Sequence, residues 1–157
     1  MRTVDRLGMK ASLDRVFRAA IEVEQWPVLL GHYRWVTVLE RRQDGALVEM
    51  AAWRPFGPLK YPTWWVSEMR VDRSAVAVHY RHVRGITAGM NVVWQLEPSG
   101  SGTDVTIVHE WSGPAWPLIG PAAARAVIGP VFIHGIASRT LAGIAAFVER
   151  DQKGTSA

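Results

Sequence analysis

The feature that most constrains the fold is a series of alternating segments between residues 33 and 111. In each segment, apolar and polar residues alternate over about nine positions, and short stretches rich in Gly, Pro, Asp and Ser separate the segments. Turns this short join antiparallel neighbours, because a parallel pair needs a crossover of about a dozen residues or more. The sequence therefore predicts a continuous antiparallel sheet with strands at 33–41, 46–53, 63–71, 75–83, 90–97 and 103–111.

Helical patterns flank these strands. A short strand near the N-terminus leads to Ser12, a good helix N-cap, and apolar residues at helical spacing follow it. The pair Trp26-Pro27 ends that helix, and a second short helix precedes the alternating segments. After them, Pro130 can open a long apolar helix that runs to Glu149.

This order predicts an α+β fold. We expect a curved antiparallel sheet of about seven strands around the long C-terminal helix, with two short helices after strand 1. Residues 1–150 are expected to form one domain, and residues 151–157 a disordered tail. The gap between the curved sheet and the long helix is the one sizeable cavity that this layout offers.

Composition and charge exclude several classes of protein. The 157 residues include no cysteine, which excludes a disulfide scaffold, a thiol nucleophile and a Cys-ligated metal site. The 18 Lys and Arg residues outnumber the 14 Asp and Glu residues, but they are scattered rather than gathered in a stripe. We therefore expect no nucleic-acid partner. No histidine pair has metal-ligand spacing backed by a carboxylate, so we expect no metal, and no phosphate-binding motif or other cofactor signature is present.

The apolar C-terminal region is too short between charges to cross a membrane. Arg125 and Arg139 interrupt it, whereas a spanning helix needs about 20 predominantly apolar residues. The first ten residues carry charges and contain no apolar targeting segment. The expectation is a cytoplasmic protein without a membrane span.

Eight tryptophans are more than a small core needs. They predict a cavity with flat aromatic walls that suits a flat or apolar ligand. The alternative is a Trp-rich core with further Trp on the surface, which explains part of the set.

Several motifs resemble the aromatic polyketide aromatase/cyclases, which belong to the START-like helix-grip superfamily. The resemblance covers roughly residues 10 to 112 and, more loosely, the final helix. It rests on Val23-Glu24-Gln25-Trp26-Pro27, Tyr33, Val38-Leu39, Trp65-Val66-Ser67, Arg81, Met90-Asn91, Trp94 and Val108-His109-Glu110-Trp111. It implies a helix-grip fold and a pocket that binds a poly-β-keto or polycyclic aromatic intermediate.

The resemblance also implies which strand faces are internal. If Trp65 and Ser67 face the cavity, alternation places Met69 there and Glu68 in solvent. The same argument points Met90 and Trp94 inward on one strand, and His109 and Trp111 inward on another. The predicted substrate-binding residues are Trp26, Trp65, Ser67, Met69, Met90, Trp94 and Trp111.

Tyr33, Arg81 and His109 are the predicted catalytic residues. An aldol cyclisation needs a base for an α-proton and a donor for the developing oxyanion, and His109 suits proton transfer near neutral pH. Alternatively, His109 is a core histidine that hydrogen-bonds a backbone carbonyl, Tyr33 only packs at a strand start, and Arg81 points outward.

One departure separates this chain from the family pattern. Similar aromatase/cyclases carry an arginine where this chain has Met69. Two functions therefore stay open: a cofactor-independent polyketide cyclase or dehydratase, and a non-catalytic carrier of an apolar ligand such as a quinone or lipid. An acyl-carrier protein is a candidate partner for the first. The surplus apolar surface of the final helix is compatible with a monomer or a homodimer.

Overall fold

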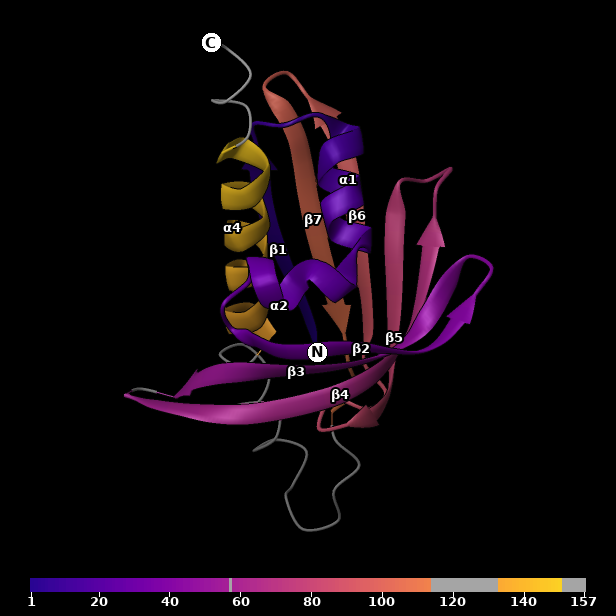
Figure 1. Cartoon of the computed structure of the whole chain (residues 1–157), viewed down its shortest axis with the longest axis vertical. Helices are drawn as coiled ribbons and strands as arrows, with labels where there is room; N and C mark the ends of the chain where they lie inside the picture. Colours follow the sequence, from indigo (N-terminus) through magenta and orange to yellow (C-terminus); the bar gives the residue numbers. More distant parts are fainter. Residues whose placement is uncertain (57, 114–132, 151–157) are drawn as a thin grey trace.

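The protein is described from a computed structural model covering residues 1–56, 58–113 and 133–150. Seven strands and four helical segments make up these ranges (Figure 1). In chain order they are β1 (Arg2–Met9), α1 (Leu13–Ile21), the 3-10 helix η1 (Val23–Gln25), α2 (Trp26–Leu29), β2 (Tyr33–Arg42), β3 (Gly45–Phe56), β4 (Leu59–Asp72), β5 (Ala77–Gly85), β6 (Asn91–Ser99), β7 (Gly102–Glu110) and α4 (His134–Arg150). The predicted starts of the last helix at Pro130 and of the tail at Asp151 lie outside the described residues.

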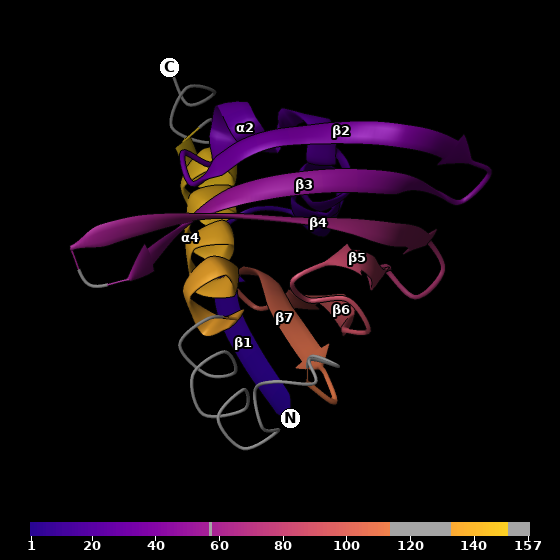
Figure 2. The ribbon, with the colours of Figure 1, turned by 90° about the horizontal axis from the view of Figure 1, so that it is seen from below.

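The strands form one antiparallel sheet in the order β1-β7-β6-β5-β4-β3-β2. Each strand from β2 to β7 pairs with its neighbour in sequence, and β1 pairs with β7. The sheet curves, and α1, α2 and α4 lie on its concave side (Figures 1 and 2). The predicted α+β helix-grip fold is confirmed.

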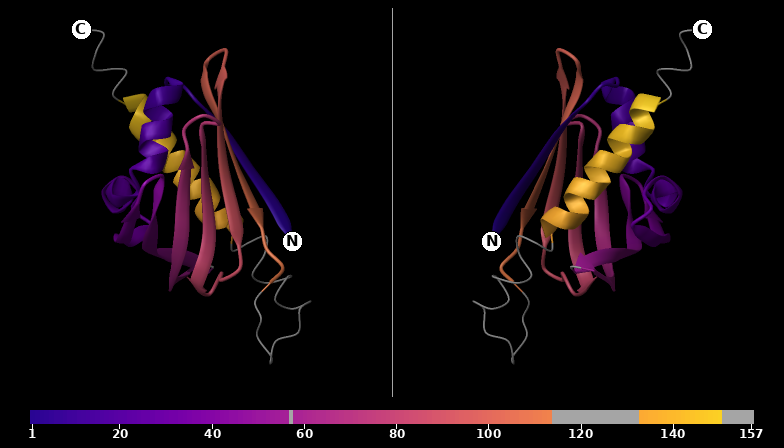
Figure 3. Two further views of the ribbon diagram at one scale, coloured as in Figure 1. Left: turned by 90° about the vertical axis from the view of Figure 1, so that its right-hand side faces the viewer. Right: turned by 90° about the vertical axis from the view of Figure 1, so that its left-hand side faces the viewer.

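Helix α4 runs obliquely across the concave side beside α1 (Figure 3). It packs on β1 and on α1, and its inward residues Leu141, Ile144 and Val148 are fully buried. Helix α1 follows Ser12, which has the extended backbone of an N-cap but makes no side-chain capping bond. Its apolar face, with Val16 at 1% exposure, completes the cover of the sheet.

The hairpin between β3 and β4 is longer than the sequence predicted. One predicted strand ends at residue 53 and the next begins at residue 63, because three prolines lie between them. In the structure β3 continues to Phe56 and β4 begins at Leu59. Pairing with β2 ends at Ala52, and pairing with β5 ends at Trp65. The outer part of the hairpin is thus a two-stranded ribbon with open edges, where a missing proline N–H breaks no ladder bond.

Candidate functional site

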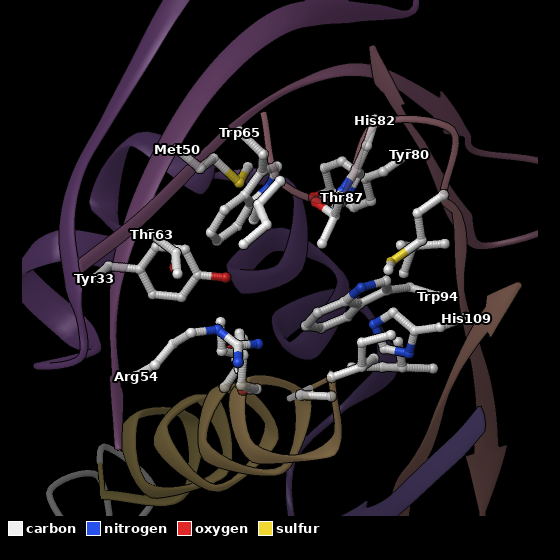
Figure 4. Close-up of a pocket in the computed structure, with 18 of the residues that line it drawn as sticks. Tyr33, Met50, Arg54, Thr63, Trp65, Tyr80, His82, Thr87, Trp94 and His109 are labelled. Atoms are coloured by element: carbon white, nitrogen blue, oxygen red, sulfur yellow. Dashed lines mark hydrogen bonds between the residues drawn. The ribbon is translucent and has the colours of Figure 1, made fainter. Parts of the chain in front are cut away.

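A cavity lies between the concave face of the sheet and α4 (Figure 4). Its empty volume, including the open space at its mouth, is about 640 Å³. Every strand from β2 to β7 contributes to it. The lining residues are Trp26, Tyr33, Met50, Arg54, Thr63, Trp65, Tyr80, His82, Ile86, Thr87, Met90, Val92, Trp94, Ile107, His109, Ile133, Ile136, Ala137 and Thr140.

Aromatic rings form a continuous wall along one side of the cavity. The ring centroid of Trp26 lies 5.2 Å from that of Tyr33 and 5.6 Å from that of Trp94. Tyr33 in turn meets Trp65 at 6.2 Å in an edge-on arrangement. The indole N–H of Trp26 donates to the carbonyl oxygen of Ala19 at 3.0 Å, which fixes the central ring. This wall suits a flat ligand.

Two imidazoles lie at the β5–β7 side of the cavity. His109 Nδ1 is 3.4 Å from the hydroxyl of Thr3, its partner across β1 and β7. His82 Nδ1 is 2.6 Å from the hydroxyl of Thr87, and its ring stacks on Trp65 with 16° between the planes. Each imidazole therefore has one nitrogen held by a threonine.

Burial lowers the pKa of both imidazoles. Desolvation lowers the pKa of His109 from 6.5 to about 4. Desolvation, and secondarily the charge of His109, lowers the pKa of His82 to about 3. No carboxylate is among the described residues that line the cavity, so no counter-charge there favours an imidazolium. Both rings are neutral at pH 7.

Hydroxyl groups gather at the opposite side of the cavity. The hydroxyl of Thr140 donates to the carbonyl oxygen of Ile136 at 2.8 Å and lies 3.0 Å from His32 Nε2. Burial raises the pKa of the Tyr33 phenol, although a hydrogen bond with Thr140 opposes the shift. Desolvation lowers the pKa of His32 to about 4, with a smaller contribution from the charge of Arg139. Tyr33 is therefore a neutral phenol that can donate a hydrogen bond.

Arg54 and Tyr80 add two further polar groups. The side chain of Arg54 points from β3 into the cavity above α4 (Figure 4) and is 6% exposed. Desolvation lowers the pKa of its guanidinium to about 8. The Tyr80 hydroxyl is buried and has no hydrogen-bond partner among the described residues. Its pKa is raised by burial and by its proximity to Tyr33.

The structure brings together most of the predicted site residues. Trp26, Tyr33, Trp65, Met90, Trp94 and His109 line the cavity. Ser67, Met69 and Trp111 are also buried but are not among the lining residues. The indole N–H of Trp111 donates to the carbonyl oxygen of Ala88 at 3.0 Å. What these residues do to a ligand stays a prediction.

The prediction that Arg81 points into the cavity is wrong. Arg81 is exposed and pairs across the sheet with Glu68, which lies on the outer face. Directly paired residues share a face, so Arg81 lies outside with it. Pairing runs without a shift from Asp72–Ala77 beside the turn to Ser67–His82, so the hairpin register fixes this phase. A shift of one residue would move the side chain to the other face.

Sequence reasoning missed several lining residues, above all His82, Tyr80 and Arg54. The alternation Val78, Tyr80, His82 is a signal that could have found two of them. Arg54 continues the inward series of β3, but an arginine is usually assigned to solvent. Thr87 comes from the loop between β5 and β6, where no periodicity applies.

Two other findings concern the described residues alone. Among them, no three His, Asp or Glu side chains form a group that could hold a metal ion. No helix in that part of the chain is long and apolar enough to cross a membrane.

The architecture is the helix-grip fold, which solved START superfamily and aromatase/cyclase structures share. A START superfamily protein from Mycobacterium smegmatis superposes with a TM-score of 0.70 at 13% identity, covering 95% of this chain and 97% of that one. The Zhui aromatase/cyclase from a Streptomyces species superposes with a TM-score of 0.82 at 18% identity, covering 96% of this chain and 94% of that one. At these identities the likeness establishes the fold alone.

The sequence itself establishes the family. Residues 9–131 match the family described as polyketide cyclase / dehydrase and lipid transport, and the chain belongs to it. A curated protein of Streptomyces cyaneus, named "Putative polyketide cyclase", is 31% identical over 103 residues. That match covers 64% of this chain and 66% of the relative, slightly under two thirds of its length. The family resemblance predicted from the motifs is confirmed.

Proposed function

We propose that the protein is a polyketide cyclase or aromatase that binds a poly-β-keto or polycyclic aromatic intermediate and promotes its aldol cyclisation and dehydration without a cofactor. The observation that carries the proposal is the cavity, in which an aromatic wall holds a neutral imidazole and a neutral phenol. Membership of the polyketide cyclase/dehydrase family supports the same reading.

In this proposal, His109 accepts a proton from a methylene flanked by two carbonyls. The electron pair of the broken C–H bond forms an enolate, which attacks a second carbonyl of the same chain. The phenol of Tyr33 donates its proton to the oxygen of the attacked carbonyl as the C–C bond forms. In the dehydration, the Tyr33 phenolate accepts a further α-proton and the His109 imidazolium protonates the departing hydroxyl. Water leaves, the C=C bond forms, and both residues return to their neutral states.

The aromatic wall supplies the other part of the catalysis. A flexible poly-β-keto chain can fold in many ways, and a narrow cavity with flat walls selects a folded shape that brings one methylene to one carbonyl. Exclusion of water by Trp26, Trp65 and Trp94 strengthens the hydrogen bonds made inside. Arg54 provides a buried cationic group that can hold an enolate or carboxylate of the substrate.

The experiment is a reconstituted polyketide assay with His109→Ala and Tyr33→Phe variants. We expect each variant to form the natural product more slowly and to change the product profile. For His109→Ala, loss of the proposed base should lower the rate of product formation by roughly 10²- to 10⁴-fold. The matched control is His79→Ala, because His79 lies on the outer face and pairs with Arg70. Unchanged rates and products in both cavity variants would refute the enzyme.

The second candidate is a carrier of an apolar ligand, such as a quinone or lipid. Two observations favour it: the family description includes lipid transport, and Met69 stands where similar cyclases carry an arginine. Native mass spectrometry of freshly purified protein separates the two, since a co-purified quinone or fatty acid supports the carrier. The same spectra report whether the chain is a monomer or a homodimer. Adding a loaded acyl-carrier protein to the sample tests whether the two proteins form a complex.

A further inference from the structure

His82 lines the cavity and has no role in the aldol step proposed above. Its ring stacks on Trp65, with the ring centroids 5.8 Å apart. His82 lines the cavity from β5, and His109, the proposed base, lines it from β7. A second imidazole in the same cavity can stabilise the charge that proton removal creates.

The loop after β5 holds His82 from two directions. The backbone N–H of His82 donates to the carbonyl oxygen of Met90 at 2.9 Å, and the carbonyl oxygen of His82 accepts from Gly89 at 2.8 Å. Gly85 has φ +92°, and a Cβ there would lie 2.4 Å from the carbonyl oxygen of Trp64. Only glycine permits this sharp exit from the strand, which brings Thr87 over the imidazole.

The contact with Thr87 selects the nitrogen that faces a ligand. The Thr87 hydroxyl lies 2.6 Å from His82 Nδ1, so Nε2 is the ring nitrogen left for a bound molecule. If the threonine donates its proton to Nδ1, the ring carries its own proton on Nε2. Burial keeps this imidazole uncharged at neutral pH, so it can donate a hydrogen bond without first taking up a proton.

We propose that His82 is a catalytic hydrogen-bond donor that binds the oxygen of an enolate, and that Thr87 is a positioning residue that holds its Nε2–H tautomer. The substrate class is therefore an enolisable ketone, and a phenolate mimics its enolate. The proposal rests on the proposed function. His109 takes the α-proton, the C–H electron pair becomes the enolate C=C bond, and the carbonyl π pair moves to oxygen. His82 stabilises that oxygen and keeps its own proton.

The tautomer can be tested without substrate. Long-range ¹H–¹⁵N spectra of uniformly labelled protein at pH 7 should show His82 neutral and protonated on Nε2. Thr87→Val should move population to the Nδ1–H tautomer, whereas Thr87→Ser should keep the wild-type signal. A wild-type His82 protonated on Nδ1, or a spectrum that Thr87→Val leaves unchanged, would overturn the positioning role.

The oxyanion site can be tested with 2-naphthol as the probe. The wild type should bind naphtholate better than naphthol, seen as a lowered apparent pKa of the bound dye. His82→Phe should reduce that preference by roughly tenfold to a hundredfold, the range for a hydrogen bond to a charged oxygen. His82→Gln, which retains an N–H donor, should keep part of it, and His79→Gln should keep all of it.

Equal naphtholate preference in the wild type and His82→Phe would overturn the proposal. If His82→Phe does not fold, Thr87→Val provides the same comparison with the imidazole intact. Neither measurement requires turnover. A failed cyclisation assay with an intact, His82-dependent naphtholate preference would therefore count against the proposed cyclase and leave the oxyanion site standing.

Discussion

Two sets of three tryptophans lie on opposite sides of the sheet and differ in exposure. Trp26, Trp65 and Trp94 line the cavity and are 2%, 7% and 5% exposed. Trp35, Trp53 and Trp64 lie on the outer face and are 37%, 37% and 48% exposed. Trp64 and Trp65 are adjacent in sequence, so alternation along one strand assigns them to different sets.

Two tryptophans of the outer set contact charged side chains at the surface. The guanidinium of Arg34 lies 4.7 Å from the ring centre of Trp35 and 4.6 Å from that of Trp53. The Trp35 indole N–H also donates to Glu49 at 3.2 Å. These rings stabilise a cation at the surface, whereas the inner rings remove water from two imidazoles. A high tryptophan content therefore indicates an aromatic cavity only when the strand phase is known.

The largest expected effect is a difference in unfolding free energy between alanine variants of the inner and outer tryptophans. Trp26→Ala removes a buried ring that contacts Tyr33 and Trp94, and should cost about 3–5 kcal/mol of unfolding free energy. Trp53→Ala removes a ring that is 37% exposed and should cost about 1 kcal/mol. Urea unfolding of both variants measures the difference. Equal losses would show that the inner ring is not part of the packed wall.

The second expected effect is a loss of stability in acid that is caused by the two buried imidazoles of the cavity. The folded-state pKa values of His82 and His109, about 3 and about 4, lie below the ordinary 6.5. As pH falls below about 6.5, the unfolded chain binds protons that the folded protein excludes, so stability falls towards pH 4. Each imidazole should contribute on the order of 3 kcal/mol to that loss.

Urea titrations at pH 7 and pH 4.5 measure this loss. His82→Gln and His109→Gln should each lose less stability than the wild type between these two values. His79→Gln, on the outer face, should follow the wild type, because the carboxylates that titrate in this range are common to all four proteins. A His109→Gln curve parallel to the wild type would show that its imidazole is not desolvated.

A smaller effect should come from the outer set. Arg34→Ala removes the cation between Trp35 and Trp53 and should cost about 0.5–1 kcal/mol, the range for an exposed cation–π contact. Binding of 2-naphthol in the cavity should be unchanged. Thermal unfolding and the dye titration test the two statements, and a weakened dye affinity would show that the faces are coupled.

The smallest expected effect comes from the buried hydroxyl of Ser67, which does not line the cavity. Ser67 Oγ is buried and has no hydrogen-bond partner among the described residues, so Ser67→Ala should change stability by less than about 0.5 kcal/mol, or increase it. The matched comparison is Thr63→Val, which removes a bond from the Thr63 hydroxyl to the carbonyl oxygen of Ala52 and should cost about 1 kcal/mol. Calorimetry resolves the contrast, and a clear loss for Ser67→Ala would reveal a bound water.

Local patterns predicted the strands closely and the site only in part. Alternation correctly placed Trp94 and His109 on the cavity-facing side of the sheet, because both lie on regular strands among apolar neighbours. It misplaced Arg81 because the register that sets Arg81 opposite Glu68 is a property of the β4–β5 pair and not of either strand alone. The length of the β3–β4 hairpin was underestimated for a related reason. A proline breaks a strand only where a neighbouring strand needs the N–H that proline lacks.

The sequence by itself determined the order of elements, the single curved sheet, the family and the aromatic character of the interior, because each of these depends on periodicity or on motifs of consecutive residues. Tertiary structure decided that His82 and Arg54 face the cavity, that Arg81 faces solvent, and that Thr87 holds an imidazole. These contacts depend on register and on loop geometry, which are set by pairs of segments far apart in the chain. Desolvation likewise exists only once the walls have assembled, so the neutrality of the two imidazoles is a property of the folded protein.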